Sequence, residues 1–162
     1  MSQRFPYEHD VDTVYALITD PAFFKERCES MGEKNVSVDV SQAGDKLTMT
    51  VSRTVVRELP KVLAKMFSSE NTINAVMHWT DHGDGQKKSG NYEAEVQGQP
   101  VKLLASYELV PRGDGCEYVI DISCKAKIPL VGKKVEKFVA EQSAEAQPEE
   151  ARLTREALAA RA

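Results

Sequence analysis

The sequence predicts an α+β domain in which a curved antiparallel β-sheet of about six or seven strands wraps around a long C-terminal helix. Apolar and polar residues alternate in successive segments between residues 36 and 128, and turn sequences separate these segments. On both sides of this region the apolar spacing changes to the three-to-four-residue period of helices. Hairpin-linked strands of this kind have one dry face, which the last helix would cover.

The first 32 residues predict a strand followed by two short helices. Residues 2–8 form the strand, and Asp10 is placed to cap the first helix. The pair Asp20-Pro21 ends that helix and begins the second, because Asp is a good N-cap and Pro fits the first helical position. Gly32 closes the second helix.

The strands and the last helix follow. Apolar residues at 62, 63, 66 and 67, after a break at Leu59-Pro60, predict one or two helical turns within the strand region. After residue 128 a stripe of Val131, Val135 and Phe138 predicts the covering helix. We expect residues 1–145 to form the domain and residues 146–162 to be a polar tail, either frayed or a weakly docked helix. The alternating segments lie at about 36–40, 47–51, 73–79, 92–96, 101–109 and 118–128.

Composition and charge fit one ordinary globular domain of 162 residues, 41% hydrophobic and 28% charged. A net charge of −4 provides no basic surface for nucleic acid or for an anionic membrane. No apolar run is long enough to cross a bilayer, and the first residues lack the apolar core of a signal peptide. We therefore expect a soluble, cytoplasmic protein without a transmembrane segment.

The three cysteines agree with a reducing compartment. Cys116 and Cys124 fall on one predicted strand, which separates their Cα atoms by roughly 26 Å and forbids a disulfide. Cys28 lies in a helical segment, and none of the three has the spacing of a metal site. We expect three free thiols, packed as small apolar side chains.

The order of these elements resembles the helix-grip pattern of the START-like superfamily, which includes polyketide cyclases, birch-pollen-allergen-type proteins and lipid-transfer domains. The resemblance covers residues 1–145 and is strongest with an uncharacterised bacterial family of this fold. Segments specific for the fold say little about activity, because one fold hosts many functions. The segments that carry the resemblance are Phe5-Pro6-Tyr7, residues 11–23, Glu58-Leu59-Pro60, Trp79 at its strand end, and Ile128-Pro129-Leu130 with the helix start to Lys137.

The resemblance implies a cavity between the sheet and the last helix. Tyrosine and tryptophan on the dry parity would give a mostly apolar pocket a few hydrogen-bonding groups. The alternative is that the same residues fill a solid core. The candidate ligand-binding residues are Met49, Arg53, Met77, Trp79, Tyr92, Tyr107, Tyr118, Val135 and Phe138.

Arg53 and Arg57 also fall on the dry parity, where an unpartnered guanidinium is costly. Three interpretations compete. A β-bulge reverses the register, the side chains reach water at the sheet end, or they meet an anionic group of a ligand.

No catalytic, metal or cofactor motif stands out. The cluster from His78 to His82 lacks the three or four convergent ligands of a zinc site, and we expect a polar strand end there. The favoured hypothesis is a noncatalytic protein that binds or carries an apolar small molecule or lipid, with no cofactor. The alternatives are a cyclase- or hydrolase-like enzyme that uses the same cavity, and a protein-interaction module with a filled core.

Overall fold

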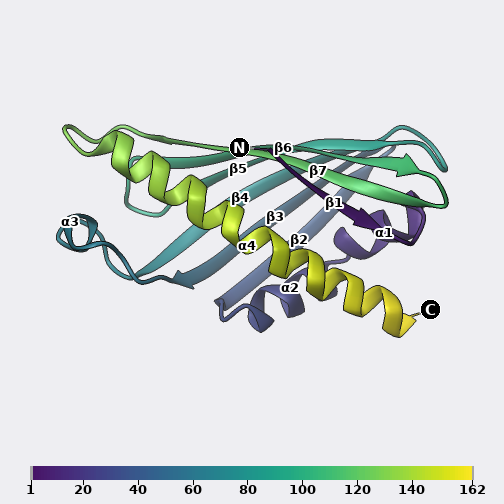
Figure 1. Cartoon of the computed structure of the whole chain (residues 1–162), viewed down its shortest axis with the longest axis horizontal. Helices are drawn as coiled ribbons and strands as arrows, with labels where there is room; N and C mark the ends of the chain where they lie inside the picture. The colour runs from purple at the N-terminus through teal and green to yellow at the C-terminus, as the bar shows by residue number, and fades with distance from the viewer. Residues whose placement is uncertain (1, 162) are drawn as a thin grey trace.

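The computed structural model describes residues 2–161, which form one seven-stranded antiparallel sheet with the strand order β1-β7-β6-β5-β4-β3-β2. From β2 to β7 each strand pairs with the next along the chain, whereas β1 (Ser2–Tyr7) pairs with β7. The helix α4 (Gly132–Arg161) crosses one face of the sheet diagonally (Figure 1). The other strands are β2 (Lys34–Ala43), β3 (Lys46–Val56), β4 (Glu70–Asp81), β5 (Lys88–Val96), β6 (Val101–Arg112) and β7 (Gly115–Ala126).

Two short helices, α1 (Val11–Ile18) and α2 (Pro21–Ser30), follow β1 as predicted. Both begin at the expected caps. Asp10 accepts a hydrogen bond from the Thr13 amide at 2.8 Å, and Asp20 accepts one from the Ala22 amide at 3.0 Å. The helices lie beside the C-terminal half of α4 (Figure 1), and α2 packs on β2.

The dry face of the sheet is the predicted one. On β7, Cys116, Ile120 and Ile122 are buried, whereas the intervening Asp121 and Ser123 are exposed. The buried side chains form two apolar clusters. The larger one surrounds Val14, Trp79 and Leu109, and the smaller one surrounds Leu63, Val101 and Val135. The predicted α+β helix-grip class is therefore confirmed.

The single helical turn α3 (Lys61–Ala64) joins β3 to β4, where the sequence predicts one or two turns. It packs through Leu63 on the smaller cluster, close to the start of α4 (Figure 1). Within residues 2–161, no helix has the length and apolarity to span a membrane.

Helix α4 continues to Arg161, through the segment from residue 146 that the sequence predicts to be a polar tail, either frayed or a weakly docked helix. Ala151, Thr154 and Leu158 of this segment are buried against the core. These buried side chains are mostly small. Their face therefore lacks the broad apolar stripe by which a docked helix is predicted.

Pro148 lies inside α4 and cannot donate a hydrogen bond to the carbonyl of Ala144, four residues earlier. Gln3 of β1 replaces that donor. Its Nε2 donates to the Ala144 carbonyl oxygen at 2.9 Å. The first strand thus satisfies the backbone group that the proline leaves without a helical partner.

Candidate functional site

The first half of α4 does not pack solidly on the sheet. A cavity of about 100 Å³, here called the outer cavity, lies between them. Most of its lining is apolar, and its charged members are Arg53 and Arg57. Its apolar walls include Val55, Leu63, Val96, Val101, Val135 and Phe138.

A second cavity of about 100 Å³, the inner cavity, continues beneath the middle of α4. Met77 and the three tyrosines Tyr92, Tyr107 and Tyr118 line it. Protein interiors are close-packed and hold few voids larger than a water molecule, so two such volumes are a distinct feature of this fold. The two cavities adjoin, because Arg53, Arg57, Leu103 and Ser143 line both.

The outer cavity meets the molecular surface beside α3. An open depression there is lined by Arg57, Leu59, Phe138 and Gln142, all of which also line the outer cavity. A route therefore runs from solvent past Arg57 and Phe138 into the outer cavity and on to the tyrosines of the inner cavity.

Most of the predicted site residues line one of these two cavities. Arg53, Val135 and Phe138 line the outer cavity, and Arg53 also lines the inner cavity with Met77 and the three tyrosines. The remaining two, Trp79 and Met49, lie deeper. Trp79 borders a third volume of about 40 Å³, and Met49 is fully buried in the larger cluster and lines none of the three.

Trp79 is held between two tyrosine rings. Its ring centroid lies 5.4 Å from that of Tyr15 and 4.2 Å from that of Tyr107. Its indole Nε1 is buried without a hydrogen-bond partner in the part of the chain that the structure describes. The indole of Trp79 is therefore held by ring packing rather than by a hydrogen bond.

Arg53 points inward and is paired. Its Nε lies 3.3 Å from Glu33 Oε1, and its Nη2 donates to the Tyr92 hydroxyl at 3.2 Å. Its side chain is only 16% exposed. The β2–β3 pairing does contain a register shift between Lys34 and Ser37, but the register of β3 with β4 is continuous, so a bulge does not turn Arg53 outward.

A second, partly buried ion pair joins α2 to α4. Arg27, with a side chain 11% exposed, lies 3.2 Å from Glu150 and donates to the Thr154 hydroxyl at 3.1 Å. Its guanidinium also lies over the rings of Phe23 and Phe24, 5.6 and 5.1 Å from their centroids. Arg27 and Glu150 both line the inner cavity, and each neutralises the other.

Arg57 has different partners from Arg53 and Arg27. Its Nη1 donates to the amide oxygen of Gln142 at 3.3 Å, and among residues 2–161 no carboxylate lies within ion-pair distance of it. Burial lowers the pKa of Arg57, although an arginine remains charged at any physiological pH.

The tyrosines are protonated hydrogen-bonding groups. Burial raises the pKa values of Tyr92, Tyr107 and Tyr118 above the ordinary tyrosine range. The Tyr107 hydroxyl donates to the Asn91 carbonyl oxygen at 2.7 Å and is engaged with the sheet. These tyrosines therefore offer apolar ring surface and neutral hydroxyls, and they do not offer a phenolate base at neutral pH.

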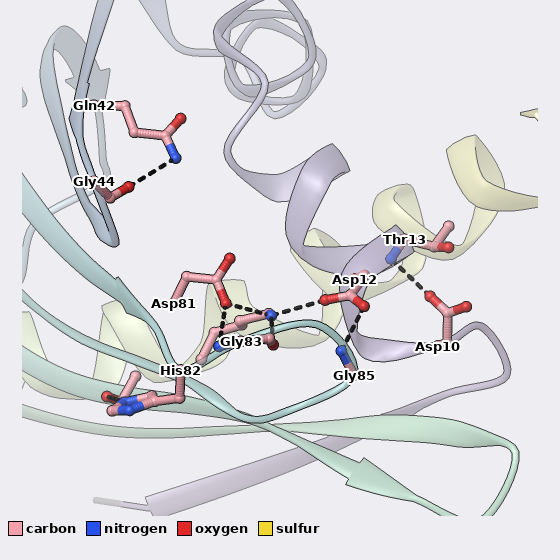
Figure 2. Close-up of polar contacts among 11 residues, drawn as sticks. Asp10, Asp12, Thr13, Gln42, Gly44, Asp81, His82, Gly83 and Gly85 are labelled. Carbon is pink, nitrogen blue, oxygen red and sulfur yellow. Dashed lines mark hydrogen bonds and ion pairs between the residues drawn. The ribbon is translucent and has the colours of Figure 1, made fainter.

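The polar cluster at the end of β4 is structural. Lys88 is fully buried there, its Nζ lies 2.6 Å from Asp81 and 2.7 Å from Asp12, and it donates to the Gly83 carbonyl. The Gly85 amide donates to Asp12 as well, so this cluster ties α1 to the β4–β5 turn (Figure 2). No group of three or more metal-ligating side chains gathers within residues 2–161.

Sequence reasoning missed Arg27, Glu33 and Glu150 as cavity residues. Arg27 had one available signal, because it shares a helix face with Phe24 and Met31, which also line the inner cavity. Glu150 falls in the segment predicted to be a polar tail, and no sequence pattern connects it to Arg27.

Comparison with known proteins supports the fold and leaves the function open. A family model described as "Protein of unknown function (DUF2505)" matches residues 2–158. Among functionally curated proteins, none matches this sequence.

Solved structures share the fold at low sequence identity. The protein TTHA0849 from Thermus thermophilus has a TM-score of 0.64 at 16% identity, covering 100% of this chain and 98% of its own. Norcoclaurine synthase from Thalictrum flavum has a TM-score of 0.55 at 13% identity, and the match covers 98% of this chain and 84% of the synthase. Ara h 8.0201 has a TM-score of 0.53 at 9% identity, and the match covers 99% of this chain and 97% of its own. The predicted match to an uncharacterised family is thus confirmed, and these solved structures share the predicted fold.

Proposed function

The chain belongs to the family described as "Protein of unknown function (DUF2505)", and we propose from its cavities that it binds and carries an apolar small molecule or lipid. The observation that supports this proposal is the pair of adjoining cavities, each about 100 Å³, with a route to solvent beside Phe138. The outer cavity is mostly apolar, and the inner cavity has a mixed lining of apolar side chains, tyrosines and paired charges. A dry engineered cavity of about 150 Å³ takes up benzene. Each compartment here is smaller, so we expect an elongated ligand that extends through both.

Two features favour a carrier over an enzyme. The partly buried ion pairs Arg27–Glu150 and Arg53–Glu33 engage the two carboxylates of the cavity lining that could act as general bases. The hydroxyl of Tyr107 is bonded to the sheet backbone. The polar groups of the cavity thus serve mainly to neutralise one another, as in a binding pocket with a few orienting groups.

The test uses 1-decanol as an uncharged elongated probe. Binding is followed by titration calorimetry and by the emission of Trp79, the only tryptophan of the chain. We expect saturable binding at micromolar concentrations. Ala105→Phe, which fills the inner cavity, should weaken binding at least tenfold, whereas Ala43→Phe on an exposed strand end should not. Failure of 1-decanol to bind, or equal binding by Ala105→Phe, would contradict a carrier function.

A further inference from the structure

The charges that line the two cavities do not balance. The charged side chains of the lining are three arginines and two glutamates. Glu33 neutralises Arg53 and Glu150 neutralises Arg27, which leaves Arg57 with the neutral side chain of Gln142. The positive charge of Arg57 therefore has no paired carboxylate in the lining of the two cavities.

Arg57 lies where a ligand would enter. It is one of the residues that line the outer cavity, the inner cavity and the open depression at the surface. A guanidinium has five N–H donors in a planar fork that fits a carboxylate, and Gln142 is the one side-chain acceptor that the structure records for Arg57 within residues 2–161. Donors of Arg57 thus remain available at the mouth. Glu58 also lines the mouth, but within residues 2–161 no ion pair joins it to Arg57.

We propose that the ligand is an apolar molecule that ends in a single carboxylate, with the carboxylate at Arg57 and the apolar part in the outer and inner cavities. This inference rests on the proposed function and specifies the class of ligand. A partly desolvated cation without a counter-ion is costly, and a carboxylate placed beside it removes that cost through charge-assisted hydrogen bonds.

The number of spare charges selects the head group. One uncompensated cation matches the single charge of a carboxylate, whereas a phosphate monoester carries about −1.5 to −2 at neutral pH. A second negative charge would have to compete with Glu33 for Arg53 or remain unpaired in the cavity. The number of unpaired charges therefore favours a carboxylate over a phosphate monoester as the head group.

The experiment compares decanoate with 1-decanol, which share the alkyl chain and differ in charge. In the native protein at pH 7.5 we expect decanoate to bind about ten- to a hundredfold more tightly, the range of a hydrogen bond to a charged group. Arg57→Gln should reduce that ratio to about one. Lys137→Gln is the matched control, because Lys137 is an exposed cation of α4. It should leave the ratio unchanged.

Each outcome decides the inference. A ratio near one in the native protein, or a ratio that persists in Arg57→Gln, would overturn the carboxylate assignment and leave the carrier function standing if 1-decanol binds. Failure of both probes would overturn the carrier function too. Thermal unfolding separates binding from structure. The unliganded Arg57→Gln protein should melt at the same or a higher temperature, because it loses no ion pair.

Discussion

Lys88 and Arg57 are cations shielded from solvent at opposite ends of strands β3, β4 and β5, and their surroundings differ. Lys88 lies at the end we call the closed end, defined by α1, Trp79 and the β4–β5 turn, where the adjoining volume is the small one of about 40 Å³. Its ammonium has two carboxylates within 2.7 Å and a backbone carbonyl at the same distance. Arg57 lies at the open end, defined by α3 and the start of α4, where the cavities meet solvent. Its only recorded side-chain partner within residues 2–161 is Gln142.

The difference separates a structural charge from one that is available to a ligand. At the closed end each donor of Lys88 has an acceptor, and Lys88 lines none of the three volumes described above. At the open end the charge and the cavity occur together. Burial of a charge thus indicates a binding role only where the partners are incomplete and a void adjoins it.

The largest expected contrast concerns packing. Trp79→Ala should lower the free energy of unfolding by about 3–5 kcal/mol, because it removes a buried ring that packs between Tyr15 and Tyr107. Phe138→Ala should cost only about 1–2 kcal/mol, because Phe138 is half-buried and already borders a void. Urea unfolding of both variants measures the contrast, and equal losses would mean that the two ends are equally packed.

The second contrast concerns the cations. Lys88→Met should lower the free energy of unfolding by about 3 kcal/mol, because Asp12 and Asp81 would lose the charge they surround. Arg57→Gln should change it by no more than about 0.5 kcal/mol. The same urea experiment tests both, and a large loss in Arg57→Gln would assign that side chain a structural role like that of Lys88.

A smaller effect is expected where α4 passes from the open to the closed end. Gln3→Ala should cost about 1 kcal/mol, because the Ala144 carbonyl loses its donor. In a Pro148→Ala background the helix can supply an amide of its own, so the same substitution should cost clearly less. A double-mutant cycle measured by thermal unfolding checks this, and additive losses would show that Gln3 does not compensate for Pro148.

The smallest effect is a pH dependence at the closed end. The hydrogen bond from Lys88 is the main cause that holds the pKa of Asp81 below its ordinary value of about 3.9. A lowered carboxyl pKa contributes stability above the unfolded pKa and loses it as the pH falls through the folded one. Between about pH 4 and pH 2, Lys88→Met should therefore lose less stability than the native protein, by at most about 1 kcal/mol. Equal losses of unfolding free energy in the two proteins over this pH range would refute the prediction.

The sequence predicted the strands, the helix caps and the dry face, because alternation and capping are local properties. Arg53 shows the limit. The alternation of apolar and polar residues places Arg53 on the dry face but does not identify its partner. Glu33 comes from the segment before β2, and only the folded chain brings the two side chains within 3.3 Å. The same holds for Arg27 and Glu150. The volume of a cavity is also not local, since the same apolar residues could have filled it.

The C-terminal half of α4 shows a second limit. Its buried positions include Ala151 and Thr154, whose small side chains let the helix approach its neighbours closely. Hydrophobicity counts rank such residues low, so the segment reads as a polar tail. The separation of the chain into residues 1–145 and a tail from 146 rested on that reading.

The pairing of β1 with β7 has a kinetic consequence. Strands β2 to β7 pair with their chain neighbours, whereas Ser2 pairs with Asp121, so the first strand must close a long loop. Helix α4 can cover only a sheet that already exists. We therefore expect a meander of local hairpins to form early and the cavities to form last. A ligand held in them would slow unfolding and leave the rate of folding almost unchanged.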